Sequence, residues 1–397
     1  MKVLILSPFP LDWDKPKGGI ESTLQYFLDG VGERRDVELH VVTSLPAVPA
    51  PQVRQRGPVR ITYLPRRRRG RMIFYRQDFA AIRQVVEHER PDLVHAHGTT
   101  FYAGAALASG VPAVITAHGI VFRELRYSSG WSEKGRTLWD ALYERCCVRR
   151  ARYLIAIAPY VQREFAKVTR ARTWAVPNPV SPGFFSLERE PQPNRILFAG
   201  VVTPRKAVHE LVQAVGRVRR MLPQAHLRIA GDMGGNPRYA AYVKRLVAEE
   251  RLEDNVQFLG ALSEQAVLEE YRRAAVLVLP AHQETLPAVV AQAMAARLPV
   301  VSTAVGGVPD IVEDGRTGLL VRPGAVRDMA SALLRLLTNQ PLASSLAGAA
   351  HEYAFAHFPA SVVADAVLEV YRQALCEEGT RAEQPCAVPA RREGGDA

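Results

Sequence analysis

The chain has 397 residues, which is more than one ordinary hydrophobic core accommodates, so its length predicts two domains. Hydrophobic residues make up 48% of the chain and charged residues 23%, as in globular proteins, and no apolar run has the length of a membrane span. The four cysteines have neither metal-ligand spacing nor the pattern of a disulfide framework. These values exclude a membrane-spanning protein and a disulfide-stapled domain.

The net charge of +11 indicates an anionic partner, which could be nucleic acid, a membrane surface or a substrate. The densest basic stretch is Arg66–Arg71, and apolar residues follow it, as in segments that contact an anionic membrane. A solvated loop is an equally good interpretation. No nucleic-acid-binding module accompanies the stretch, so we predict no nucleic-acid partner. Met1 and Lys2 lead into a short strand rather than a signal core, and we expect a cytoplasmic location, with peripheral contact to the inner face of the membrane as an option.

Short apolar runs that predict buried strands alternate with longer stretches of helical spacing. The first series comprises residues 3–6, 39–43, 93–96, 113–116 and 153–157, and the second comprises 195–198, 227–230, 256–259, 276–279 and 300–302. This alternation predicts two α/β domains, each built on a parallel sheet. Ligands bind such sheets at the carboxyl ends of the strands, so the residues that follow each strand are the first candidates for a site.

A proline-rich segment separates the two series. Its prolines, which lie between residues 176 and 193, disfavour both helix and sheet, so we predict an irregular linker there. We assign residues 1–183 to an N-terminal Rossmann-like domain and 184–360 to a C-terminal one. The helical spacing of 361–375 predicts a helix that packs back on the N-terminal domain, and the polar composition of 377–397 predicts a disordered tail.

A glycine pair, Gly18 and Gly19, follows the first predicted strand and Lys17, at the point where a helical pattern begins. Glycine lets backbone amides approach an anion, and the N-terminus of a helix favours phosphate. A plain turn is the alternative interpretation, and these residues alone do not separate the two.

Histidines lie at the ends of the third and fourth predicted strands. His95 and His97 share one strand face, and His118 follows the next strand. The spacing is compatible with metal ligands, but strand histidines are more often hydrogen-bonded structural residues, so we predict no metal site. Asp12 and Asp14 have the Asp-x-Asp spacing of some manganese sites, yet they lie in a proline-rich loop, and we interpret the spacing as a coincidence.

The second series of strands is followed by two charged segments. Arg205 and Lys206 come after the strand at 195–198, and adjacent cations at a strand end suit a pyrophosphate, although a solvated loop would look the same. Glu284 lies between the strand at 276–279 and a helix predicted from Ala288, with Pro287 suited to the first helical turn. Phosphate would repel this carboxylate, so its plausible partners are sugar hydroxyls or a backbone amide.

Taken together, these motifs resemble a retaining glycosyltransferase of family 4, of the group 1 type, over nearly all of the residues up to about Leu375. The segments that carry the resemblance are Gly18-Gly19, Thr116-Ala117-His118-Gly119, Pro204-Arg205-Lys206 and the block from Glu284 through Met294 to Val305-Gly306-Gly307-Val308-Pro309. The resemblance implies the GT-B fold, in which two Rossmann-like domains with parallel sheets face a central cleft, the N-terminal one on the acceptor side and the C-terminal one binding a nucleotide-sugar donor.

The resemblance also implies roles for single residues. His118 would contact the transferring sugar, Glu284 would hold that sugar, and Lys206 would stabilise the departing nucleoside diphosphate. The residues implied for the donor site are Gly18, Gly19, Arg205, Lys206, Glu284, Thr285, Leu286, Pro287 and Gln292. Members of the family usually work without a bound metal or another cofactor, and we expect none here.

Three positions depart from the family pattern. The second of its two glutamates, seven residues beyond the first, is Gln292 here, which keeps an acceptor oxygen for a ribose hydroxyl but lacks the charge that strengthens such a bond. The family's glycine-arginine pair reads Gly200-Val201, and its lysine-glycine pair reads Lys206-Ala207. We expect weaker donor binding without loss of the chemistry, with Arg205 compensating for the missing cation.

The implied activity is retaining transfer of a hexose-type sugar from a UDP-sugar or GDP-sugar to an acceptor hydroxyl, in the synthesis of cell-surface polysaccharide, glycolipid or glycoconjugate. The acceptor would be a glycan, a lipid-linked molecule or a small molecule. A sugar-nucleotide 2-epimerase of the same fold is one alternative. A weakly active or partner-dependent homologue, suggested by Gln292 and Val201, is another.

Overall fold

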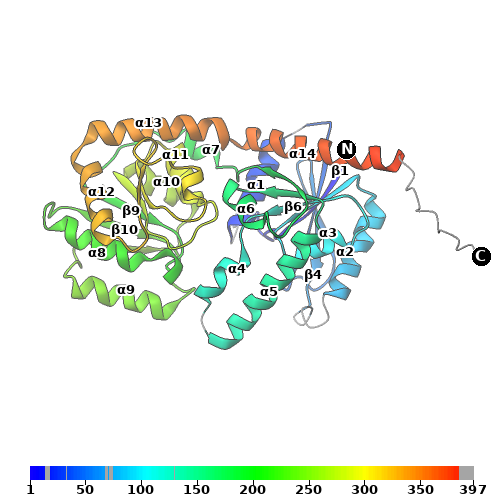
Figure 1. Cartoon of the computed structure of the whole chain (residues 1–397), viewed down its shortest axis with the longest axis horizontal. Coiled ribbons are helices and arrows are strands. Elements are labelled where there is room, and N and C mark those ends of the chain that lie inside the picture. The colour runs from blue at the N-terminus through cyan, green and yellow to red at the C-terminus, as the bar shows by residue number, and fades with distance from the viewer. Residues whose placement is uncertain (14–17, 33, 68–69, 71–74, 129, 384–397) are drawn as a thin grey trace, which may run out of the picture.

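The computed structural model describes residues 1–13, 18–32, 34–67, 70, 75–128 and 130–383, and Figure 1 shows that they form two α/β lobes joined near the middle of the chain. Several residues singled out in the sequence lie outside this range. They are Asp14, Lys17, Arg68, Arg69, Arg71 and the segment 384–397. Within the described residues, no helix combines the length and the apolar character needed to cross a bilayer.

The N-terminal sheet has the strand order β3-β4-β2-β1-β5-β6-β7-β8. Its strands are β1 (Lys2–Leu6), β2 (Glu38–Leu45), β3 (Gln52–Arg56), β4 (Val59–Pro65), β5 (Leu93–His97), β6 (Ala113–Ala117), β7 (Tyr153–Ala156) and β8 (Arg172–Ala175). The helical elements among them are α1 (Gly19–Val31), α2 (Arg76–Glu89), α3 (Phe101–Leu107), α4 (Val121–Glu124), η2 (Leu125–Tyr127), α5 (Gly130–Arg150) and α6 (Pro159–Phe165). All neighbouring strands are parallel except β3 and β4, which form an antiparallel hairpin.

The C-terminal sheet is parallel throughout and has the order β11-β10-β9-β12-β13-β14. Its strands are β9 (Arg195–Ala199), β10 (His226–Ala230), β11 (Val256–Gly260), β12 (Val276–Leu279), β13 (Val300–Thr303) and β14 (Leu319–Val321). The helical elements are α7 (Pro182–Phe185), η3 (Pro204–Lys206), α8 (Val208–Arg219), α9 (Pro237–Glu249), α10 (Glu264–Arg273), α11 (Ala288–Ala295), η4 (Val308–Asp310), α12 (Val326–Thr338), α13 (Gln340–His357) and α14 (Ala360–Glu383). The strand order reverses between β9 and β12, which is where a Rossmann-type sheet binds its ligand.

All ten strands predicted from apolar runs are present, but the sequence analysis missed β3, β4, β8 and β14. The missed β3 is almost entirely exposed and polar, and β8 lies at an edge of its sheet with no fully buried residue, so neither leaves an apolar run in the sequence. The predicted linker is also not wholly irregular, because Pro182 begins the one-turn helix α7. Proline is tolerated at that position since its missing N–H would have no partner there.

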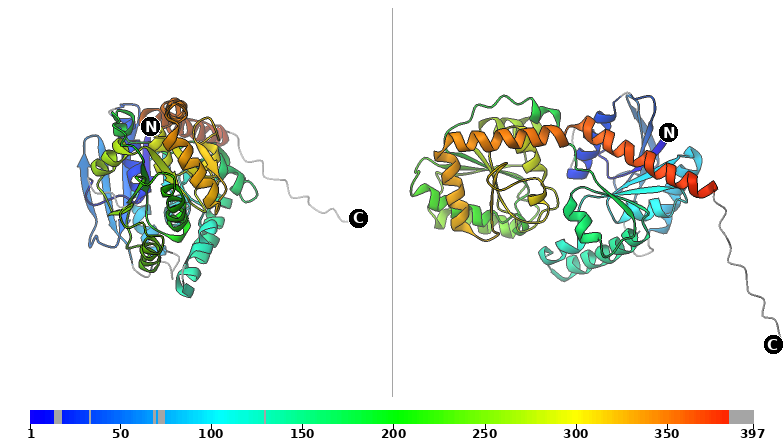
Figure 2. Two further views of the ribbon diagram at one scale, coloured as in Figure 1. Left: turned by 90° about the vertical axis from the view of Figure 1, so that its left-hand side faces the viewer. Right: turned by 45° about the horizontal axis from the view of Figure 1, so that its top comes forward.

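The last helix, α14, continues to Glu383, so the prediction of a disordered tail from residue 377 is wrong for residues 377–383. Two ion pairs with the N-terminal domain hold this extension: Arg172 with Glu377, and Arg152 Nη1 with Glu378 Oε2 at 2.8 Å. Figure 2 shows α14 running from the C-terminal lobe back across the N-terminal lobe, where it packs against α1 as expected. The buried Tyr371 hydroxyl reaches His95 Nδ1 at 2.6 Å and fixes this helix to the sheet.

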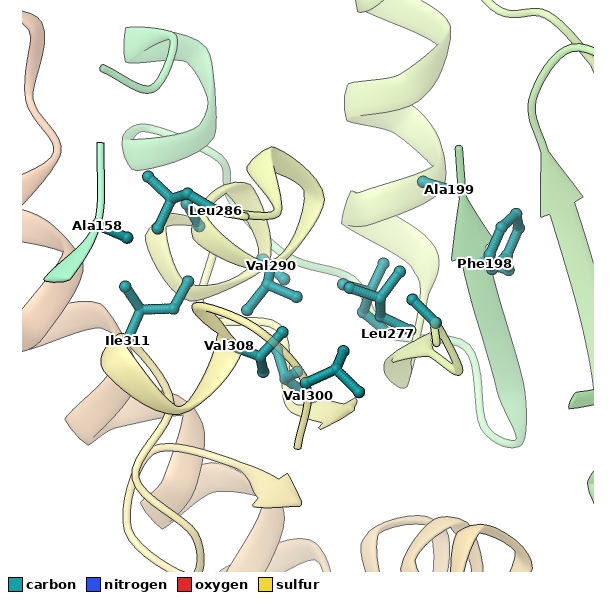
Figure 3. Close-up of a cluster of buried hydrophobic side chains, with 14 of the residues drawn as sticks. Ala158, Phe198, Ala199, Leu277, Leu286, Val290, Val300, Val308 and Ile311 are labelled. Carbon is teal, nitrogen blue, oxygen red and sulfur yellow. The ribbon is translucent and has the colours of Figure 1, made fainter. Parts of the chain in front are cut away.

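The loop that follows β12 is anchored from below by a hydrophobic cluster. Figure 3 shows Leu286 of this loop in the same buried cluster as Val290 of α11 and Val308 of η4. Burying side chains of this size stabilises a segment by about 1.5–3 kcal/mol each. The polar residues that precede Leu286 are therefore carried on a rigid base.

The packing of α14 on α1 makes a testable prediction at Gly30. A Cβ at this position would lie 2.2 Å from the Ala360 carbonyl oxygen, so Gly30→Ala should lower the free energy of unfolding by ~1–3 kcal/mol despite the higher helix propensity of alanine. Gly348 on α13 is the matched control, because a Cβ there meets no atom within 4 Å. Denaturant unfolding should show that Gly348→Ala is neutral or stabilising, and an equal gain from Gly30→Ala would contradict the close packing.

Candidate active site

The polar residues predicted from the C-terminal half meet at the carboxyl ends of β9 and β12. Lys206 Nζ lies 2.5 Å from Glu284 Oε1, and Arg205 Nη1 lies 3.3 Å from the same oxygen. Glu284 is 5% exposed and the Lys206 side chain is 12% exposed, so this ion pair is nearly buried, whereas the Arg205 side chain beside it is 30% exposed. The strand-order reversal causes this contact, since it places two loops that are far apart in sequence side by side.

Backbone contacts tie these two loops together. Arg205 Nη1 donates to the Gln283 carbonyl oxygen at 2.9 Å, and the His282 amide donates to the Arg205 carbonyl oxygen at 2.8 Å. Ala207 has φ +49°, a left-handed conformation that glycine adopts more easily, and this is the position at which the resembled family has glycine. Arg205 and Lys206 are thus held in fixed positions at the cost of some backbone strain.

A second polar contact supports the site from beneath. His282 Nε2 lies 2.7 Å from Glu210 Oε1, and the other oxygen of Glu210 accepts a hydrogen bond from the Gly324 amide at 3.2 Å. The sequence analysis missed His282 and Glu210. They are 72 positions apart, and only the packing of α8 beneath the loop brings them together.

Two glycines of the Gly306-Gly307 motif form the wall behind Glu284. A Cβ at Gly306 would lie 1.7 Å from the Glu284 carbonyl oxygen, and one at Gly307 would lie 1.9 Å from the Thr285 carbonyl oxygen. No side chain fits either position without moving the loop. Pro287, expected in the first turn of α11, instead occupies the N-cap position directly before the helix, which begins at Ala288.

Gln292 lies half-buried on α11, and its amide oxygen already has a neighbour. The hydroxyl of Tyr271 is 3.4 Å from Gln292 Oε1 and donates at 3.1 Å to the Val289 carbonyl oxygen, which is the better acceptor. Because an amide oxygen has two lone pairs, one acceptor position remains for a ligand hydroxyl.

On the N-terminal side, His118 follows β6 and its Nε2 lies 2.9 Å from His97 Nδ1. Burial lowers the pKa of His118 to about 4, and the side chain of Asn178 opposes this shift only in part. Asn178 does not reach His118 Nδ1 with the geometry of a hydrogen bond, and this nitrogen has no other partner among the described residues. His118 is therefore a neutral imidazole at pH 7.

His95 fits the structural interpretation better than a metal-binding one, because both its ring nitrogens are engaged. Nδ1 lies 2.6 Å from the Tyr371 hydroxyl, and Nε2 lies 2.7 Å from the Thr116 hydroxyl. Across the part of the chain that the structure describes, no group of three or more histidine, cysteine or acidic side chains is arranged to hold a metal. The ring of His97 lies 4.4 Å from that of His95, and it links this structural histidine to His118.

Gly18 and Gly19 lie at the exposed start of α1. No side chain caps this helix end, and a Cβ added at either glycine would meet no atom within 4 Å. An uncapped helix N-terminus in open space can receive an anion on its free amides. A role of this glycine pair in donor binding stays a prediction.

A cavity of about 280 Å³ lies between the two domains beside Arg205. Glu124 and Tyr127 line it from the N-terminal domain, and Thr203 and Asn236 line it from the C-terminal domain. Burial raises the pKa of Glu124, while Arg205 lowers it and Glu284 raises it, so Glu124 lies within electrostatic reach of the loops after β9 and β12. The sequence analysis missed Glu124, because the short helices that carry it show no periodic pattern.

Comparison with known proteins bears on this site. The family model described as Glycosyl transferases group 1 matches residues 183–353, and the one described as Glycosyltransferase Family 4 matches residues 17–184. The D-inositol 3-phosphate glycosyltransferase of Stackebrandtia nassauensis is 36% identical over 201 residues, which are 49% of this chain and 44% of that protein. The glycogen synthase of Mycobacterium tuberculosis is 30% identical over 305 residues, which are 75% of this chain and 72% of that protein.

Solved structures show the same architecture. Sucrose-phosphate synthase from Thermosynechococcus elongatus superimposes with a TM-score of 0.77 at 20% identity, over 95% of this chain and all 100% of that one. Anabaena HepE in complex with UDP-glucose gives a TM-score of 0.71 at 19% identity, over 94% and 100% of the two chains. The glycosyltransferase WaaG, involved in lipopolysaccharide biosynthesis, gives 0.69 at 20% identity, over 92% and 98%. These likenesses confirm the predicted GT-B fold.

The low pKa of His118 predicts a pH dependence of stability. In the unfolded chain a histidine binds a proton near pH 6.5, whereas the folded chain resists protonation until about pH 4. The unfolded state therefore binds more protons between these values, and stability falls as the pH is lowered through this window. Replacing His118 with asparagine should reduce the slope of unfolding free energy against pH by up to about 1.4 kcal/mol per unit. Denaturant unfolding at pH 4.5, 5.5 and 6.5 measures it, and an unchanged slope would show that His118 is not held neutral.

Proposed function

The chain belongs to the glycosyltransferases of group 1 and family 4, and from that premise we propose that it transfers a hexose-type sugar from a nucleoside-diphosphate sugar to an acceptor hydroxyl, with retention at the anomeric carbon. The observation that carries the proposal is the contact of Lys206 and Arg205 with Glu284 at the ends of β9 and β12. It combines the two chemistries that a sugar nucleotide needs, cations for the diphosphate and a carboxylate for the sugar hydroxyls. The complex of HepE with UDP-glucose supports this class of donor.

The charges also indicate how the donor lies. Without a ligand, Lys206 is paired with Glu284 at 2.5 Å, so a diphosphate must compete with this carboxylate for the ammonium group. Sugar hydroxyls that donate to Glu284 compensate the carboxylate when Lys206 turns to the phosphate. The donor therefore lies with its diphosphate at Arg205 and Lys206 and its sugar at Glu284.

We propose a mechanism without a protein nucleophile. The bond between the anomeric carbon and the leaving diphosphate breaks, and a new bond to the acceptor oxygen forms on the same face of the sugar. A phosphate oxygen of the leaving group accepts the proton of the acceptor hydroxyl. Lys206 and Arg205 stabilise the charge that develops on the diphosphate, which is usually the largest contribution to catalysis of this kind. His118, being neutral, accepts or donates a hydrogen bond at the sugar without adding a positive charge beside an oxocarbenium-like state.

Substitution of Lys206 tests the leaving-group role. Lys206→Ala should lower kcat at least ~100-fold, as expected when one preorganised charge is removed from a developing anion. Glu21→Ala, on the first turn of α1, is the matched control and should change kcat far less. Both are measured by nucleoside-diphosphate release with donor and acceptor. Comparable losses in the two variants would contradict the assignment.

Arg205 should contribute mainly to donor affinity, because it stands in for the arginine that Val201 replaces. Arg205→Ala should weaken donor binding by about tenfold, the usual value for one hydrogen bond to a charged group. Calorimetric titration with a UDP-sugar and a GDP-sugar measures this and also identifies the base. Equal affinity in the variant and the unaltered chain would remove Arg205 from the donor site.

We also propose that the reaction needs no bound metal, since two side-chain cations are available for the diphosphate. Treatment with EDTA followed by dialysis should leave more than about half of the activity, because the charge stabilisation comes from the protein. Loss of activity that returns on addition of Mg²⁺ or Mn²⁺ would show that a cation acts with the donor.

Incubation with the donor alone separates this activity from that of a sugar-nucleotide epimerase. A transferase hydrolyses the donor slowly at most, whereas an epimerase converts it to the other sugar nucleotide, which chromatography resolves. Failure to bind any donor in a thermal-shift screen would indicate the weakly active homologue suggested by Gln292 and Val201, because a bound donor raises the unfolding temperature.

We propose that the acceptor is a glycan, a lipid-linked molecule or a small molecule. The transfer would serve the synthesis of cell-surface polysaccharide or glycoconjugate at the cytoplasmic side of the membrane. WaaG, with the same fold, supports this setting by its role in lipopolysaccharide biosynthesis.

Membrane contact through Arg66–Arg71 stays a prediction. The guanidinium of Arg66 lies over the Phe101 ring at 4.0 Å, and Arg68, Arg69 and Arg71 lie outside the described residues.

A further inference from the structure

Helix α5 exposes a stripe of large apolar side chains on its outer face. Trp131 is 93% exposed, Leu142 is 62% exposed and Leu138 is 45% exposed. The spacings of seven and four residues place the three side chains in one line along the helix. Figures 1 and 2 show α5 along an outer edge of the N-terminal lobe.

The charges of α5 are distributed unevenly around the helix. Lys134, Arg145 and Arg149 share the outer face with the apolar stripe, by the same helical spacing. The carboxylates of α5 lie toward the other side of the helix, where Glu144 is buried and accepts a hydrogen bond from the Thr99 hydroxyl at 2.6 Å. The outer face therefore combines apolar side chains with cations and carries no acid.

A basic cavity of about 580 Å³ adjoins the end of this face. Arg145 and Arg149 line it from α5, and Lys167 and Arg170 line it from the loop that follows α6. The loop is fixed in place, because the Thr169 hydroxyl donates to the Val148 carbonyl oxygen at 2.8 Å.

Four positive charges are thereby held around one cavity, and none of them forms an ion pair in the described part of the chain. Like charges at this spacing repel one another unless an anion neutralises them. One arginine guanidinium can donate two parallel hydrogen bonds to two oxygens of the same phosphate, so the cavity suits a phosphate group.

We propose that the outer face of α5 docks on an anionic phospholipid bilayer. Trp131, Leu138 and Leu142 enter the boundary between headgroups and acyl chains, as apolar faces of interfacial helices do. The basic cavity receives the phosphate of a lipid headgroup. None of the residues of this surface belongs to the group around Glu284.

Charge favours a bilayer over a second copy of the chain. A two-fold interface would bring the same basic residues of both copies together, and repulsion would oppose it. An anionic bilayer is complementary both to the stripe and to the cations beside it.

The position of α5 connects this surface to the cleft. Glu133 and Thr137, on another side of the same helix, line the cavity between the two domains. A bilayer at the outer face would lie close to the mouth of that cavity, which suits a lipid-linked acceptor. This last point rests on the proposed function, whereas the docking itself does not.

Vesicle co-sedimentation of the full chain tests the proposal. The chain should pellet with vesicles of phosphatidylcholine and phosphatidylglycerol, less so at high salt, and should stay in solution with pure phosphatidylcholine. Arg145→Ser/Arg149→Ser and Trp131→Ser/Leu142→Ser should each reduce the bound fraction about tenfold or more. The matched controls are Arg217→Ser and Met221→Ser, which alter an exposed arginine and a 71% exposed apolar residue of the C-terminal domain and should pellet like the unaltered chain.

Several outcomes would overturn the proposal. They are failure to pellet with anionic vesicles, equal pelleting with neutral ones, and unchanged pelleting of both double variants. Binding of inorganic phosphate without vesicle binding would reassign the cavity to a soluble anion. A dimer in analytical ultracentrifugation that Trp131→Ser/Leu142→Ser dissolves would reassign the stripe to self-association. Donor binding, measured on the same variants by thermal shift, should be unchanged, so failure of docking is distinguishable from failure of the proposed transfer activity.

Discussion

The contact between Lys206 and Glu284 is the interaction on which the functional interpretation depends. It joins the loop after β9 to the loop after β12 at 2.5 Å, and it exists because the sheet order reverses between these two strands. The surrounding structure serves to hold it: the Gly306-Gly307 wall packs on the backbone of Glu284, and Glu210 fixes His282 beneath. A nearly buried pair of this kind is costly to desolvate, and a ligand that supplies both an anion and hydroxyl donors can replace it without leaving either charge unpaired.

The two halves of the site are electrostatically different. The C-terminal loops offer cations and one carboxylate, whereas the N-terminal side offers the neutral His118, held by His97, and the nearby Glu124. This difference suits a reaction in which negative charge develops on the nucleotide side and positive charge on the sugar. The departures from the family pattern, at Val201, Ala207 and Gln292, fall where the proposed function places the nucleotide. On that proposal they bear on donor affinity more than on the sugar-transfer step.

Much of this arrangement could be predicted from the sequence, because buried parallel strands leave apolar runs and the residues after them fall at one edge of a sheet. Glu284, Lys206 and Arg205 were found in this way. His282, Glu210 and Glu124 could not be, since their contacts depend on tertiary packing between distant segments. The strands β3 and β8 were missed because exposed edge strands lack an apolar pattern, and the helical extent of residues 377–383 was missed because its acidic residues pair with Arg152 and Arg172 across the fold.

Binding of the nucleoside diphosphate alone to Glu284→Gln tests the central claim most directly. If Glu284 holds the sugar and competes with phosphate for Lys206, glutamine at this position should keep or raise the affinity for the bare nucleoside diphosphate in calorimetry. The same variant should lose most of its transfer activity with the complete donor. A parallel loss of nucleoside-diphosphate affinity would contradict the account, because it would place the carboxylate at the nucleotide and not at the sugar.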